Sequence, residues 1–102
     1  MYLIQLLLPL HDNEKENFPT SYFEEVRAHL ADAFGGVTAF VRSPATGFWK
    51  EDVEKVTRDE VVLFEVMTDE VDKNWWQSYR RDLEEKFRQD DLMIWAVPVT
   101  KL

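Results

Sequence analysis

The segment MYLIQLLLPL, residues 1–10, is almost uninterrupted in its apolar character, and it constrains the fold more than any other feature. Ten residues are too few to cross a bilayer as a helix. The segment also lacks the basic region and the small-residue cleavage site of a secretory signal, and Gln5 and Pro9 interrupt it. Its length favours a strand that is covered on both faces. We therefore predict a central strand over Tyr2–Leu10 in a cytoplasmic protein without a membrane segment.

Composition and charge exclude several classes of function. The 102 residues are enough for one domain, predicted over 1–102, and they carry a formal net charge of −8. Nucleic acid and anionic membranes both attract clusters of Lys and Arg, so neither is an expected partner. The absence of cysteine excludes disulfides and thiolate chemistry. His11 and His29 lack the spaced partners of a zinc site, and no phosphate loop occurs, so neither a metal nor a cofactor is expected.

Two segments have the periodicity of amphipathic helices. The first is FPTSYFEEVRAHLADAFGG, in which Ser21 and Glu24 form a potential capping box and the two glycines can end the helix. The second is predicted over about 71–89. A shift of 53 residues, which carries Phe34 onto Phe87, aligns aromatic, arginine and leucine positions of the two segments. Two helices with the same stripe indicate a repeated strand–helix–strand unit.

Three further segments are predicted to be strands: Val37–Arg42, Glu60–Met67 and Leu92–Val99. SPATG supplies turn residues after the first of them, with Gly47 permitting the turn, and EDVEKVTRDE is either a loop or the far arm of an extended hairpin. Pro98 places the last strand at an edge. The βαββαβ order with right-handed crossovers predicts an α+β, ferredoxin-like sandwich. Its four-stranded antiparallel sheet has the order 4-1-3-2, with both helices on one face.

Strand alternation predicts what the helix-free face of such a sheet exposes. The exposed set is mostly apolar and consists of Leu3, Leu7, Phe40, Leu63, Met67, Trp95 and Val97. A surface of this size is rarely left in water. We expect a homodimer in which two sheets pack face to face, and the alternatives are coverage by residues 43–59 or by another partner.

Gln5, Arg42 and Glu65 are polar residues within this apolar face. Because buried polar groups need partners, the structural interpretation is a contact of Glu65 with Arg42 or Gln5. The functional interpretation is a pocket for a small apolar ligand, which Gln5 and Arg42 orient between the walls formed by Phe40 and Trp95. Glu65 is then a weak candidate for a general base, because desolvation disfavours the charged carboxylate.

His11, at the end of the first predicted strand, is the other candidate proton carrier. The topology predicts that it shares one end of the sheet with Arg42, Ser43 and Trp49, so Trp49 is a candidate ligand-binding residue. The alternative, which we favour, is a solvated loop histidine. His29 is expected on the polar side of the first helix as a surface residue.

The sequence FGGVTAFVRSPATGFW, with WW and LEEKFRQDDL downstream, resembles short bacterial proteins of uncharacterised function that share FGG-x-T followed by G-x-W. This resemblance implies no assigned activity. At the level of the fold alone, the architecture resembles the dimeric α+β barrel group, which includes cofactor-independent monooxygenases and muconolactone-isomerase-like enzymes. The leading hypothesis is a homodimeric module that binds a small molecule or a partner through the open sheet face. The alternatives are a cofactor-independent isomerase or oxygenase and a ligand-sensing module.

Overall fold

The computed structural model describes the backbone of residues 1–48 and 56–102 and the side chains of residues 1–38 and 61–102. The elements follow in the order β1 (Tyr2–Pro9), α1 (Thr20–Phe34), β2 (Thr38–Phe48), β3 (Val56–Thr68), α2 (Lys73–Lys86) and β4 (Met93–Pro98). The chain therefore has the predicted α+β class and the predicted βαββαβ order.

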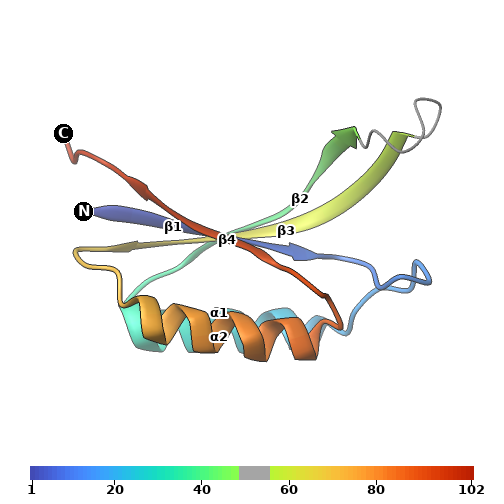
Figure 1. The fold of residues 1–102 in the computed structure, drawn as a ribbon, viewed down its shortest axis with the longest axis horizontal. Coiled ribbons are helices and arrows are strands. Elements are labelled where there is room, and N and C mark those ends of the chain that lie inside the picture. Colours follow the sequence, from blue (N-terminus) through green and yellow to red (C-terminus); the bar gives the residue numbers. More distant parts are fainter. Residues whose placement is uncertain (49–55) are drawn as a thin grey trace.

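The strands form one sheet in the order β2-β3-β1-β4, and every neighbouring pair is antiparallel. This is the predicted order read from the opposite edge, with β1 and β3 at the centre. Both helices lie on one face of the sheet and leave the other face bare (Figure 1). β4 is an edge strand, as expected for a strand that carries Pro98.

The core lies between the sheet and the helices. Its sheet side consists of every second residue of the two central strands, all buried: Ile4, Leu6, Leu8, Val62, Phe64 and Val66. The residues between them are more exposed. This alternation confirms the predicted core face of β1 and β3, because successive side chains of a strand point to opposite faces.

The helices cover this core with the stripe that the repeat predicted. Val26 and Leu30 of α1 are buried, and so are Trp76 and Leu83 of α2. These four positions follow the 3.6-residue period of a helix, so one face of each helix meets the sheet.

Phe87, directly after α2, closes one end of the core. It is fully buried, and its ring centroid lies 5.0 Å from that of Phe18, 5.6 Å from that of Tyr22 and 5.4 Å from that of Phe23. The contacts with Phe18 and Tyr22 are edge-to-face, an arrangement that aromatic pairs favour. The cluster holds the loop before α1 against the end of α2.

The start of α1 differs from the prediction. The N-cap residue is Pro19, with φ −56° and ψ 140°, and no side chain caps the helix. Ser21 therefore lies inside the first turn, and the predicted capping box with Glu24 is wrong. With Pro19 as the N-cap, the helix begins two residues earlier than a cap at Ser21 requires.

Two other helix ends use local chemistry. Gly35 ends α1 in the left-handed conformation with φ 75°, and its N–H donates to the Ala31 carbonyl at 2.8 Å. This confirms the predicted glycine stop. At the start of α2, the Asp72 carboxylate accepts a hydrogen bond from the Trp75 N–H at 3.1 Å, which satisfies an otherwise orphaned donor.

The hairpin of β2 and β3 is longer than predicted. β2 continues through SPATG, where Gly47 pairs with Thr57 and Phe48 with Val56. The prediction of a turn at SPATG is therefore wrong, because pairing with β3 overrides the local turn propensity. Of the two predictions for EDVEKVTRDE, the far arm of a hairpin is confirmed for its described residues, 56–60. β1 ends at Pro9, which pairs with Val61 of β3, and the part of the β2–β3 hairpin beyond this pair projects from the sheet (Figure 1).

Candidate functional site

We call the sheet face opposite the helices the open face. Its described side chains alternate with those of the core and are Leu3, Gln5, Leu7, Pro9, Thr38, Val61, Leu63, Glu65, Met67, Met93, Trp95 and Val97. Four of them, Met67, Met93, Trp95 and Val97, are between 39% and 53% exposed. Among the side chains of residues 1–38 and 61–102, only Met1 and Leu102 are comparably exposed large hydrophobics outside this set. The exposed apolar surface of the described chain is therefore concentrated on one face.

A hydrogen-bonded row of side chains crosses the middle of the open face. Gln5 of β1 pairs with Trp95 of β4 on one side and with Glu65 of β3 on the other. Trp95 Nε1 donates to Gln5 Oε1 at 2.6 Å, and Gln5 Nε2 donates to Glu65 Oε2 at 2.7 Å. The predicted Gln5–Glu65 contact is confirmed, and Trp95 extends it. We call these three residues the polar row.

The remaining predicted ligand-binding residues are only partly described. Phe40 pairs through its backbone with β3, and Arg42 lies at a register shift between Val41 and Ser43, where β2 carries an extra residue. The side chains of Phe40 and Arg42, and all of Trp49, lie outside the described part of the chain. Their roles remain predictions. Residues 43–48 and 56–59, predicted as a possible cover, continue the hairpin as strands.

His11 lies beyond the end of β1, where it forms an isolated β-bridge with Asn17. It is separated from Gln5 by six positions, and six residues of extended chain measure about 20 Å. Because Gln5 contacts Glu65, the structure does not bring His11 to Glu65. The two candidate proton carriers therefore do not form one catalytic pair.

His29 joins the two helices. Its ring stacks on Trp75 of α2 with centroids 5.6 Å apart and an interplanar angle of 7°, and its centroid lies 4.7 Å from that of Tyr79. His29 is exposed, as expected of a surface residue, but the expectation did not include this aromatic cluster. Burial raises the pKa of Tyr79 to about 12, and the charge of Asp82 acts in the same direction. The cluster belongs to the helical layer, away from the open face.

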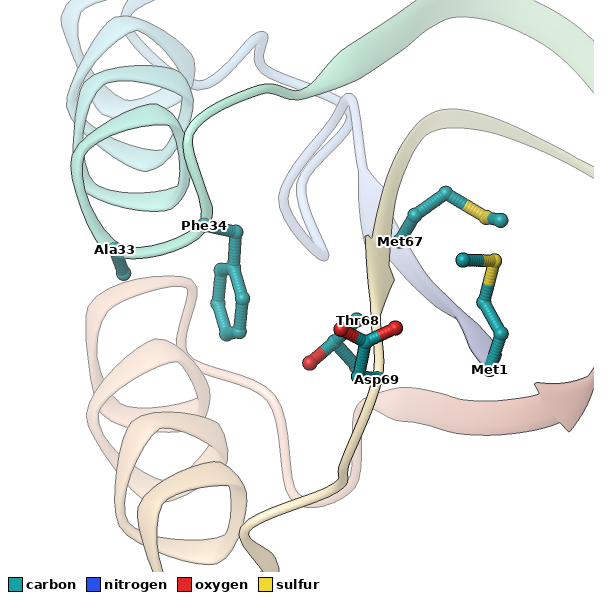
Figure 2. A pocket seen from close by; sticks show the side chains of 6 residues that line it. All are labelled: Met1, Ala33, Phe34, Met67, Thr68 and Asp69. Carbon is teal, nitrogen blue, oxygen red and sulfur yellow. The ribbon is translucent and has the colours of Figure 1, made fainter.

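An open cavity of about 430 Å³ lies at one end of the molecule. Its lining comprises Met1, Ala33, Phe34, Met67, Thr68 and Asp69. Figure 2 shows Phe34 between the end of α1 and β3, with Met1 and Met67 beside each other on the other side of that strand. Gln5 and Trp95, the predicted ligand-binding residues whose side chains are described, do not line this cavity. Its one acidic residue, Asp69, begins the segment DEVD, which follows the third predicted strand after Thr68 and to which the sequence analysis assigned no role.

Two features are absent from the described residues, 1–48 and 56–102. No group of three or more His, Cys, Asp or Glu side chains in this part of the chain is arranged to hold a metal ion. Neither of the two described helices combines the length and the apolar character needed to cross a membrane.

Comparisons with known proteins show the fold and leave the site unassigned. No family model and no curated protein matches the chain. The chain is similar to a crystal structure of CutA1 from Pyrococcus horikoshii OT3, with a TM-score of 0.61 and 16% identity over 100% of this chain and 86% of that chain. It is also similar to a phage SAM lyase in complex with S-methyl-5'-thioadenosine, with a TM-score of 0.55 and 11% identity over 96% and 89% of the two chains. At these identities the likeness is one of fold alone.

Proposed function

We propose that this protein is a self-associating module in which two copies pack their open faces against each other and enclose the polar row. The observation that carries the proposal is the concentration of exposed apolar side chains on the one sheet face that the helices leave bare. Removing such surface from water contributes about 25 cal/mol per Å². Patches of this kind commonly mark interaction sites.

The distribution of charge favours a second copy as the occupant. The chain has a net charge of −8, yet Glu65 is the only charged residue among the described side chains of the open face. Two copies that meet through this face keep the acidic residues of their helices and loops apart in solvent. Repulsion between the two net charges is then weakened by screening over about 10 Å at ordinary ionic strength.

The dimensions of the sheet also suit a second copy. Four strands spaced by about 4.8 Å measure about 19 Å across, and the eight residues of β1 measure about 26 Å at a rise of about 3.3 Å. The face therefore covers roughly 500 Å² in each copy. Two copies would bury about 1,000 Å², which is near the lower limit for a specific interface.

The amide and the indole of the polar row are compatible with this burial. A buried donor or acceptor without a partner costs about 1–3 kcal/mol. Gln5 uses both ends of its side-chain amide within its own chain, and the Trp95 indole N–H is also bonded. A second sheet that approaches this face therefore meets no unpaired amide or indole group.

Two substitutions in β4 test the proposal. Val97 lies on the open face, whereas Ala96 pairs with the core residue Ile4 and lies on the other face, and both are exposed. In sedimentation equilibrium, we expect the full chain to have twice the 12.1 kDa mass of one copy. Val97→Glu should yield a monomer, because a dimer of this variant would bury an unpaired charge in its interface. Ala96→Glu should remain a dimer. A wild-type monomer at every concentration would reject the proposal, and a dimeric Val97→Glu variant would place the contact elsewhere.

The cavity favours a second candidate function, the binding of a small organic cation. Its volume of about 430 Å³ lies within the usual range for small-molecule sites, and Asp69 is the one acidic side chain in its lining. The Phe34 ring supplies an aromatic face to which a cation is attracted. In this hypothesis the small-molecule site is the cavity and not the pocket that the sequence analysis expected around Gln5 on the open face.

The cation hypothesis is tested by titration with benzylamine and with uncharged benzyl alcohol. Trp76, whose ring stacks on Phe34 at 5.3 Å, is a fluorescent reporter next to the cavity. We expect benzylamine to bind more tightly than the alcohol. Asp69→Asn should remove this preference, and Glu70→Gln, at the adjacent exposed position, should keep it. Equal binding of the two compounds to the unmodified chain would reject the hypothesis.

A further inference from the structure

The three methionines of this chain are all on its surface. Met1, Met67 and Met93 are 43%, 47% and 53% exposed, and the buried core contains no methionine. Methionine is a flexible apolar residue that commonly fills gaps in cores. In this chain, thioether chemistry is therefore available only at the surface.

The methionines lie towards the two ends of the open face. Met67 of β3 pairs with Leu3, and Met93 of β4 pairs with Leu7, so they lie on either side of Gln5 along β1. Met1 lies beside Met67 (Figure 2). The polar row therefore runs between two thioether groups, and both belong to the surface that the proposed dimer buries.

We propose that Met67 and Met93 form an oxidation site, at which conversion to methionine sulfoxide by a peroxide releases the self-association. This inference rests on the proposed function. The sulfur lone pair attacks one peroxide oxygen, a sulfur–oxygen bond forms, and the oxygen–oxygen bond breaks. The sulfur loses two electrons and the peroxide gains them, and the second oxygen leaves as water when hydrogen peroxide is the oxidant.

Oxidation opposes association because a sulfoxide is polar. The new oxygen needs a hydrogen-bond donor, and the open-face neighbours Leu3 and Leu7 supply none from their side chains. A buried acceptor without a partner weakens association by about tenfold or more. A symmetric dimer contains Met67 and Met93 twice, so full oxidation adds four sulfoxides and is expected to raise the dissociation constant by about ten-thousandfold. The core is free of methionine, so the fold of each copy should persist.

The experiment treats the full chain with hydrogen peroxide and counts the added oxygen atoms by mass spectrometry. Sedimentation equilibrium then measures the dissociation constant, and far-UV circular dichroism reports whether the helices and the sheet of each copy persist. We expect the dissociation constant to rise by about ten-thousandfold while the far-UV spectrum is retained. Methionine sulfoxide reductase should restore association.

The double variant Met67→Leu/Met93→Leu is the matched control, because leucine keeps the apolar volume and cannot be oxidised at sulfur. It should dimerise before and after peroxide treatment. An oxidised wild-type dimer as tight as the untreated one would overturn the inference alone. An equal loss of association by the double variant would also overturn it, because another oxidised group would then be responsible. A wild-type chain that is monomeric before treatment would reject the proposed function together with this inference.

Discussion

Replacing Gln5 by leucine tests whether the open face is covered, because it removes the amide that joins Trp95 to Glu65. The substitution eliminates two hydrogen bonds, of 2.6 Å and 2.7 Å. In a monomer, water can replace both partners, and each bond contributes a net 0.5–1.5 kcal/mol or so. The leucine adds apolar surface in exchange. We therefore expect the free energy of unfolding of the monomer to fall by about 1–2 kcal/mol at most.

The expected effect on a dimer is much larger. The Trp95 indole N–H and the Glu65 carboxylate would be buried without the Gln5 amide, at about 1–3 kcal/mol each. That amounts to roughly 2–6 kcal/mol in each copy and 4–12 kcal/mol in a dimer. Since about 1.4 kcal/mol corresponds to a factor of ten, the dissociation constant should rise by about three orders of magnitude or more.

Sedimentation equilibrium measures this change in association, and urea unfolding of dilute protein measures the stability of the monomer. The matched control is Gln77→Leu, the same chemical change at an exposed position of α2. It should leave association unchanged. A Gln5→Leu variant that dimerises as tightly as the unmodified chain would show that the polar row faces solvent, and it would refute the reasoning.

Three further predictions concern stability, and urea unfolding measures each of them. Gly35→Ala should lower the free energy of unfolding by about 1 kcal/mol because φ is 75° at this residue. At Gly36 φ is not positive, so an equal loss in Gly36→Ala would contradict that cause. Asp72→Ala should lower the free energy of unfolding by about 1 kcal/mol by removing the N-cap of α2. Ser21→Ala should change it by less than about 0.5 kcal/mol, and a loss as large as that of Asp72→Ala would show that Ser21 does cap α1. The pKa of Tyr79 is raised from 10.0 to about 12, so the unfolded chain releases the phenolic proton at a lower pH than the folded chain. The contribution of Tyr79 to the free energy of unfolding is therefore complete below pH 10 and is lost as the pH rises to about 12. Partial exposure limits this contribution to about 2 kcal/mol. Tyr79→Phe should remove the loss of stability between pH 10 and 12, and an unchanged dependence of the free energy of unfolding on pH would show that Tyr79 is not its cause.

Features that depend on local pattern could be predicted from the amino-acid sequence. The apolar run of residues 1–10 indicated a central strand, and the repeated stripe of the two helices indicated which helical faces are buried. Gly35 as a helix stop follows from its freedom at positive φ. The Gln5–Glu65 contact was also accessible, because alternation places both residues on one face and the buried core limits the register of the two strands.

Other features depend on which segments lie side by side, and only the tertiary structure decided them. SPATG has the residues of a turn, yet pairing with β3 makes it a strand. Trp95 completes the polar row with Gln5, a partner 90 residues away, and His29 stacks on Trp75 of the other helix. The cavity likewise joins the end of α1 to the end of β3. Local pattern specifies the face on which a side chain lies, whereas its partners depend on contacts between segments that are distant in the chain, and these form only when the sheet and helices pack together.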